Sequence, residues 1–164
     1  MRSTIIEADM KACIHKKIAL ALSTGGARGI SFIGVIEEFV KQGFEITSIS
    51  GCSMGAVIGA AYATGNLETC KETLCALGKR KLFKYADMPG RNGLLKGKSI
   101  MKLLGEHIPD VAIENLSLPF SAVATDIRFG KEVVFSSGSL HQAIRASISL
   151  PMIFSPVEYN DMLL

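Results

Sequence analysis

The pentapeptide Gly51-Cys52-Ser53-Met54-Gly55 places a serine hydroxyl midway between two glycines. This spacing is typical of a sharp strand-to-helix turn that exposes a nucleophile, because glycines keep side chains clear of the tight backbone. A serine in such a turn attacks a carbonyl carbon and forms an acyl-enzyme. The pattern also arises by chance, and Ser53 would then only cap the start of a helix.

A second candidate is the loop at residues 24–29, which reads Thr-Gly-Gly-Ala-Arg-Gly and has no bulky apolar side chain. Backbone N–H groups in a glycine turn before a helix converge on one point, where they hold an anion. That anion could be the phosphate of a dinucleotide, but Thr24 replaces the first glycine of the Gly-x-Gly-x-x-Gly pattern. The oxyanion of an acyl intermediate is the other choice, and a nearby nucleophile such as Ser53 favours it.

Strand and helix patterns alternate along the chain. The predicted elements must position both the Ser53 turn and the glycine loop. Alternating apolar residues or β-branched runs predict strands at residues 17–23, 44–50, 118–125 and 132–136. Helical periodicity or small apolar residues predict helices at residues 30–41, 56–63, 98–107 and 140–147. The order predicts an α/β fold with three α/β/α layers, in which a mostly parallel sheet carries helices on both faces.

Three blocks of the chain resemble one known family. Residues 23–34, 51–59 and 146–157 are similar to successive blocks of the patatin-like phospholipases, which are serine acyl hydrolases that act on lipids. The third block is extended and specific, with Ala-Ser-Ile-Ser-Leu-Pro-Met-Ile-Phe-Ser-Pro-Val as its core. The resemblance implies a patatin-like domain over residues 17–164, preceded by a polar N-terminal extension at residues 1–16.

The resemblance also implies a role for each residue of the loop and the turn. Ser53 would be the acyl-accepting nucleophile. The amides of Gly25, Gly26 and Ala27 would donate hydrogen bonds to the oxyanion, and Arg28 and Gly29 would position the loop. Gly51 and Gly55 would shape the strand-to-helix turn at residues 51–55, here called the elbow. Thr24 departs from the family, which usually has glycine there. If that position needs a positive φ, threonine costs about 1–2 kcal/mol.

No histidine is assigned as the base that would activate the serine. His15 falls in the polar N-terminal stretch, and His107 and His141 fall in predicted helices with charged or amide neighbours. Each is expected to be a solvated surface residue. Patatin-like enzymes do not use a histidine, since the resemblance implies a Ser-Asp dyad.

The dyad aspartate of the family stands in an Asp-Gly-Gly or Asp-Gly-Ala motif, a short hairpin after the third block. The 164 residues contain no Asp-Gly pair. Asp161 is expected to be a turn residue of a hairpin at residues 157–164, and Asp126 to have a structural role at a strand end. We therefore expect the dyad aspartate beyond Leu164, a C-terminally incomplete domain, and a chain that is nearly inactive alone.

Composition sets the remaining expectations. A chain of 164 residues with 48% hydrophobic residues suits one core-bearing domain. The absence of a signal-peptide pattern and of a membrane span favours a cytoplasmic protein. The spacing of the cysteines suits neither disulfides nor a metal, so all are expected to be free thiols in a reducing compartment: Cys13, Cys52, Cys70 and Cys75. No metal or cofactor is expected.

Positive charge gathers in residues 79–102, with apolar residues interleaved. This segment is either a solvated helix face that leads into a loop or a surface for transient membrane contact. The expected partner is a lipid ester substrate and not a nucleic acid, while the oligomeric state stays open. The predicted function is a lipid acyl hydrolase. An acyltransferase and a non-catalytic lipid-binding or interaction module of the same fold are the alternatives.

Overall fold

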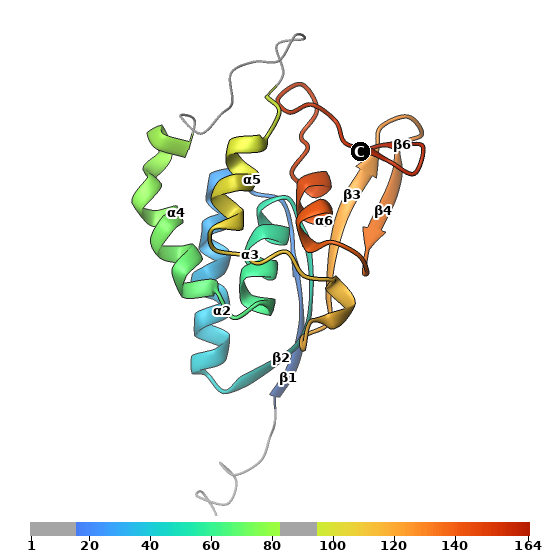
Figure 1. Cartoon of the computed structure of the whole chain (residues 1–164). Coiled ribbons are helices and arrows are strands. Elements are labelled where there is room, and N and C mark those ends of the chain that lie inside the picture. Colours follow the sequence, from blue (N-terminus) through green and yellow to red (C-terminus); the bar gives the residue numbers. More distant parts are fainter. Residues whose placement is uncertain (1–15, 83–94) are drawn as a thin grey trace, which may run out of the picture.

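The computed structural model in Figure 1 describes residues 16–82 and 95–164. Its elements, in chain order, are β1 Lys16–Leu22, the 3-10 helix η1 Gly26–Ile30, α2 Ser31–Lys41, β2 Phe44–Cys52, α3 Met54–Ala63, α4 Leu67–Leu82, α5 Lys98–Gly105, the 3-10 helix η3 Ile113–Asn115, β3 Phe120–Asp126, β4 Lys131–Phe135, α6 Leu140–Ser147, β5 Glu158–Tyr159 and β6 Met162–Leu163. The expected extension at residues 1–16 lies outside the described residues except for Lys16, and the middle of the basic segment 79–102 lies outside them too.

Four strands form one sheet in the order β1-β2-β3-β4. The first three are parallel, and β4 runs antiparallel to β3. This arrangement confirms the predicted α/β fold with a mostly parallel sheet. The pairing of β1 with β2 shifts by one residue between Ile18 and Ala19. The hydroxyl of Thr47, the extra residue of β2, donates a hydrogen bond of 3.0 Å to the Ile18 carbonyl, so the bulge keeps its polar groups paired.

The helices that contact the sheet share one of its faces. Connections between parallel strands are right-handed, so strands added in one direction place their helices on one side, and Figure 1 shows α2 to α5 on the same side of β1 and β2. Helix α3 forms the centre of the core, since a side chain at Gly59 would meet Ile49 and Phe120. It contacts both α2 and α6.

The opposite face of the sheet presents small side chains, with Ala19 and Ala21 exposed and Ser48 and Ser50 half-buried. The Ser121 hydroxyl donates a hydrogen bond of 3.0 Å to the Ser50 hydroxyl on this face. No helix of residues 16–82 or 95–164 covers it. The second helical layer of the three-layer arrangement therefore stays a prediction. None of the described helices combines the length and the apolar character that crossing a membrane requires.

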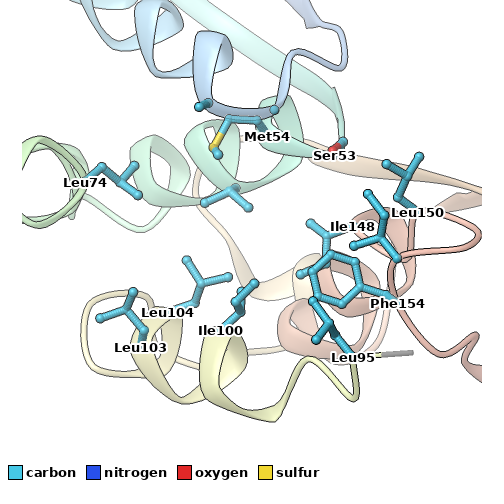
Figure 2. Close-up of a pocket in the computed structure, with 14 residues that line it drawn as sticks. Ser53, Met54, Leu74, Leu95, Ile100, Leu103, Leu104, Ile148, Leu150 and Phe154 are labelled. Atoms are coloured by element: carbon cyan, nitrogen blue, oxygen red, sulfur yellow. The ribbon is translucent and has the colours of Figure 1, made fainter. Parts of the chain in front are cut away.

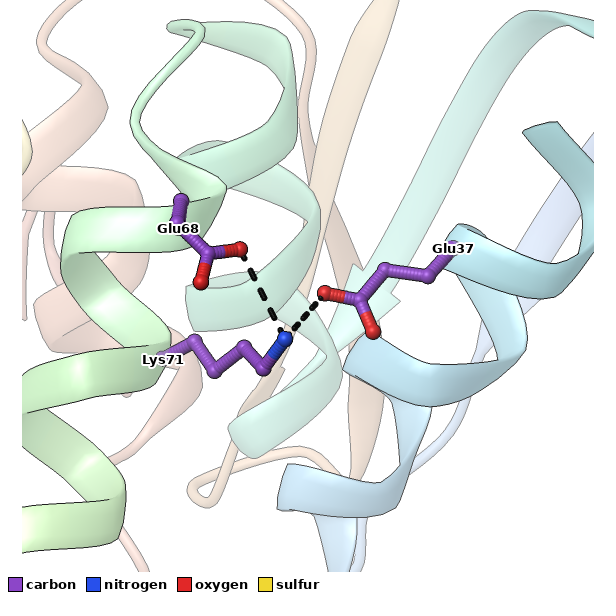
Figure 3. Close-up of polar contacts among 3 residues, drawn as sticks. All are labelled: Glu37, Glu68 and Lys71. Carbon is purple, nitrogen blue, oxygen red and sulfur yellow. Dashed lines mark hydrogen bonds and ion pairs between the residues drawn. The ribbon is translucent and has the colours of Figure 1, made fainter. Parts of the chain in front are cut away.

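Helix α4 is tied to α2 by an ion-pair network centred on Lys71 (Figure 3). The Lys71 Nζ lies 2.7 Å from Glu37 Oε1 on α2 and 3.6 Å from Glu68 Oε2 on its own helix. The hydrogen bond to Glu37, with the charges of both glutamates, raises the pKa of Lys71 above its ordinary value. These side chains remain partly exposed, and the network therefore sets the helix positions more than it stabilises the fold.

The N-terminus of α6 is capped by two side chains. The Ser139 hydroxyl accepts a hydrogen bond of 3.0 Å from the Gln142 amide. It donates in turn to Asp110 Oδ1 at 2.8 Å, and the same carboxylate accepts from the His141 amide at 3.0 Å. Partial burial raises the pKa of Asp110, but these hydrogen bonds and the charge of His141 outweigh it and leave the pKa below its ordinary value.

Replacing the cap should destabilise the chain in a pH-dependent way. Because the folded-state pKa of Asp110 is depressed, its contribution is present above the unfolded pKa and disappears as pH falls through the folded pKa. We expect Asp110→Asn to lower the free energy of unfolding at pH 7 and to match the unsubstituted chain below both pKa values. Urea titrations at several pH values measure this. A pH-independent difference between the two chains would contradict the assignment. Ser139→Ala removes the capping hydroxyl itself and should lower the free energy of unfolding by about 1 kcal/mol.

Candidate active site

Ser53 stands alone between the end of β2 at Cys52 and the start of α3 at Met54. Its backbone has φ 56° and ψ −121°, a conformation that costs about 1–3 kcal/mol for a residue with a side chain. The side chain makes no capping hydrogen bond to α3. The alternative in which Ser53 merely caps the helix is therefore not supported, and the turn has the strained geometry that presents a side chain outward.

The two glycines around Ser53 are sterically required. A Cβ atom on Gly55 would lie 2.1 Å from the backbone oxygen of Leu22, in the neighbouring strand. A Cβ atom on Gly51 would lie 2.5 Å from the Gly55 oxygen. Real Cβ atoms do not approach backbone this closely, so the bend exists only with glycine at both positions.

A hydroxyl from a distant helix holds the backbone of the bend. The Ser53 amide donates a hydrogen bond of 2.8 Å to the Ser147 hydroxyl at the end of α6. That hydroxyl donates in turn to the carbonyl of Val123 in β3, at 2.7 Å. The third sequence block contains Ser147, but sequence reasoning assigned it no role. Its signal, a small hydroxyl residue near the start of that block, is shared with Ser149 and Ser155 of the same block and does not single it out.

Ser147→Ala should loosen the bend without touching the Ser53 side chain. The variant deprives the Ser53 amide and the Val123 carbonyl of their shared partner, which costs about 1–3 kcal/mol when such groups are buried. We expect a lower free energy of unfolding and slower covalent labelling of Ser53 by an alkyl fluorophosphonate. Ser147→Thr keeps the hydroxyl and should restore both.

Ser121→Ala is the matched control, because its hydroxyl bonds to Ser50 on the open face of the sheet. The control should leave the labelling rate unchanged. Equal labelling rates for Ser147→Ala and the unsubstituted chain would show that the hydroxyl does not position the bend.

The glycine loop lies against the elbow. Gly26 has φ 50°, which a residue with a side chain rarely adopts, and the Arg28 amide donates to the Gly25 carbonyl at 3.0 Å to close the turn. A Cβ atom on Gly29 would lie 2.6 Å from the Met54 Cγ atom, so loop and elbow are packed in contact. Thr24 is not among the described residues with positive φ. The expected cost of threonine at that position therefore does not arise.

Ser53, Gly26 and Ala27 line a cavity of about 270 Å³, shown in Figure 2. Among the described lining residues, only Ser53 has a polar side chain. The others come from α3, α4, α5 and the segments around residues 95 and 148–154: Met54, Val57, Leu74, Leu95, Ile100, Leu103, Leu104, Ile148, Leu150, Ile153 and Phe154. Such a lining fits an extended apolar chain and offers nothing to a charged group.

Within the described residues, no carboxylate or imidazole forms a hydrogen bond with the Ser53 side chain. The Nε2 atom of His107 pairs with the Thr73 hydroxyl at 2.9 Å, and that of His141 pairs with the Ile108 carbonyl at 2.7 Å. Each is thus occupied elsewhere, and His15 lies outside the described residues.

The two candidate aspartates have structural contacts. Asp126 is 3% exposed, and its Oδ1 accepts hydrogen bonds from the amides of Arg128 at 3.0 Å and Leu163 at 3.4 Å. It thereby joins the end of β3 to the β5–β6 hairpin. Asp161 has φ 61° in the turn of that hairpin. These positions agree with the expected turn and strand-end roles.

The cysteines of the described residues are free thiols. Cys52, Cys70 and Cys75 form no disulfide, while Cys13 lies outside the described residues. Burial raises the pKa of the Cys70 thiol to about 11, so it is not a nucleophile at neutral pH. No group of three potential metal ligands occurs in the described part of the chain.

A mostly parallel sheet, a serine at a strained strand-to-helix bend, and an apolar cavity beside it together define an α/β protein of hydrolase-type architecture. The chain belongs to the patatin-like phospholipase family, because the model of that family matches residues 20–164.

Similar proteins carry related names. An uncharacterized NTE family protein of Mycobacterium tuberculosis is 40% identical over 149 residues, which are 90% of this chain and 41% of that protein. The neuropathy target esterase sws of Drosophila willistoni is 28% identical over 145 residues, which are 85% of this chain and 10% of that protein. The chain thus spans less than half the length of these relatives.

The fold likeness extends to a solved structure. VipD from Legionella pneumophila aligns with a TM-score of 0.53 over 93% of this chain and 45% of that chain, at 16% identity. At that identity the match supports the fold alone.

Proposed function

We propose that this chain carries the nucleophile, the oxyanion loop and the acyl-binding cavity of a lipid acyl hydrolase. One observation carries the proposal: Ser53 is the single polar side chain among the described lining residues of an apolar cavity, and the glycine loop borders the same cavity. Membership of the patatin-like phospholipase family supports the lipid ester as substrate. The name of the Drosophila relative, an esterase, agrees with this reaction class.

The proposed reaction has two steps. The Ser53 Oγ attacks the ester carbonyl and gives its proton to a base, while the lipid's acyl chain occupies the cavity. Amides of Gly25, Gly26 and Ala27 stabilise the oxyanion, each worth about 3–4 kcal/mol. The intermediate collapses to an acyl-serine and releases the alcohol, which takes up the proton, and water then hydrolyses the acyl-serine. Arg28 and Gly29 position the loop.

The base of this reaction is proposed to be an aspartate, as in the dyad of the family, that is not among the described contacts of Ser53. The lack of a carboxylate or imidazole partner for Ser53 within the described residues supports this. The 164-residue chain should therefore hydrolyse esters very slowly by itself. The same observation favours a second candidate function, a lipid-binding module that keeps the cavity without the chemistry.

Covalent labelling with alkyl fluorophosphonates of short and long alkyl chain tests the proposal, since the reagent needs a reactive serine and an apolar site. Mass spectrometry should locate the adduct on Ser53, and the long-chain reagent should react faster because the cavity binds its alkyl group first. An adduct elsewhere would contradict the hydrolase proposal. A chain that binds fatty acid but never forms the adduct would favour the binding module.

A further inference from the structure

The turn that follows α6 exposes three apolar side chains close together. Leu150 is 57% exposed, Met152 is 91% exposed and Ile153 is 45% exposed. Single exposed apolar residues are common, but a cluster of them in one turn marks an interaction site. Met152 also has φ 69°, a backbone conformation that disfavours a bulky side chain. The chain thus keeps methionine at the tip despite both costs.

Hydrogen bonds to residue 95 and to the Arg145 side chain hold the turn in place. The Leu95 amide donates a hydrogen bond of 2.9 Å to the Ile153 carbonyl, and the Ser155 amide donates one of 2.8 Å to the Leu95 carbonyl. The Arg145 guanidinium donates to the carbonyls of Lys96 and Ser155, both at 2.9 Å. With these anchors, little conformational entropy is lost when a partner contacts the turn.

The exposed tip is continuous with the cavity of Ser53. Leu150 and Ile153 are exposed and also line the cavity together with Phe154. In Figure 2, Leu150 and Phe154 lie on the same side of the cavity as Ser53. An acyl chain that enters over this turn would stay in contact with apolar surface from outside to the serine. A protein partner would gain nothing from that continuity, whereas a lipid would.

Positive charge adjoins the tip. Lys96 follows Leu95, the residue that pairs with Phe154, and its side chain is exposed. The whole chain has a formal net charge of +3. An apolar tip beside a cation suits a surface of acyl chains under phosphate groups.

We propose that the turn at residues 150–153 inserts into the surface of a phospholipid bilayer and places the cavity mouth against it. This inference rests on the proposed function in one respect: the reason for docking is to deliver a lipid ester to Ser53. The docking itself needs no chemistry at Ser53. Of the basic segment 79–102, it uses only Leu95 and Lys96, and residues 83–94 of that segment lie outside the described residues.

The test is vesicle binding by the Ser53→Ala chain, which cannot hydrolyse the lipid. Co-sedimentation with vesicles of phosphatidylcholine, with and without phosphatidylglycerol, gives a partition coefficient. We expect Met152→Ser to lower it about tenfold, the effect of losing one buried apolar side chain. Serine is smaller and tolerates the backbone at that position better, so this variant should fold. Lys96→Gln should weaken binding only to the vesicles that contain phosphatidylglycerol.

Val40→Ser is the matched control, since Val40 on α2 is 48% exposed and does not line the cavity. It should bind vesicles like its parent. An unaltered partition coefficient for Met152→Ser would overturn the proposal, and so would a parent chain that does not bind. Sedimentation equilibrium adds a third outcome, in which a dimer dissociated by Met152→Ser identifies a second copy as the partner and overturns the lipid assignment.

The failure of this inference is distinguishable from failure of the proposed function. Vesicle binding without a Ser53 adduct would support membrane docking by the turn at residues 150–153 and contradict the hydrolase proposal. A Ser53 adduct without vesicle binding would do the reverse.

Discussion

Ser53→Ala should abolish covalent labelling of the chain by a long-chain alkyl fluorophosphonate. The reagent mimics an ester at its phosphorus, and its oxygen would meet the amides of Gly26 and Ala27, which border the same cavity as Ser53. Alanine has no atom that can bond to phosphorus, so the loss of the nucleophile removes the covalent step at this position. Intact-mass spectrometry over time measures the labelled fraction.

Two comparisons give this result its meaning. Ser23→Ala is the matched control, because its hydroxyl bonds to the Thr24 carbonyl beside the loop but does not line the cavity. Added imidazole should accelerate labelling of the unsubstituted chain, since it supplies the base that the described contacts of Ser53 lack. Labelling that persists in Ser53→Ala would show that another residue reacts. Rapid labelling that imidazole does not change would show that a base is already present.

Gly55→Ala should cost about 3–5 kcal/mol of the free energy of unfolding, which is at the upper end for a single substitution. The added Cβ atom would lie 2.1 Å from the Leu22 oxygen. Neither partner of that clash is a flexible side chain, so relief requires separating α3 from β1. Urea unfolding followed by circular dichroism measures the change.

Gly34→Ala is the opposite case and serves as its control. Nothing lies within 4 Å of a Cβ atom at Gly34, in the second turn of α2. Alanine there should stabilise the chain by about 0.5–1 kcal/mol, because glycine loses more backbone freedom on folding into a helix. If Gly55→Ala proved as mild as Gly34→Ala, the close approach of α3 to β1 would be wrong.

Much of the fold could be predicted because the local patterns are strong. Strands and helices predicted from alternation and periodicity are found with bounds that differ by two residues at most. The hairpin predicted at residues 157–164 is found as β5 and β6, with Asn160 and Asp161 at positive φ in its turn. Its turn residues tolerate that conformation, which is why the sequence signals it.

The parts that could not be predicted depend on contacts between distant residues. The hydroxyl of Ser147 accepts a hydrogen bond from the Ser53 amide, 94 positions away in the sequence. Hydrophobic periodicity carries no information on such a pair. The placement of the described helices on one face of the sheet follows from strand order, which alternation does not encode. The condition under which Thr24 would be costly is not met, because the loop places its positive φ at Gly26 instead.

The hydrogen bond between Ser53 and Ser147 also has a consequence for the order in which the molecule takes shape during synthesis. The chain emerges from the ribosome with residue 53 well ahead of residue 147, and the amide of the bend lacks its acceptor until α6 has docked beside β3. The hydrogen bonding of the bend is therefore complete only when residues 53 and 147, which lie 94 positions apart, are both in place.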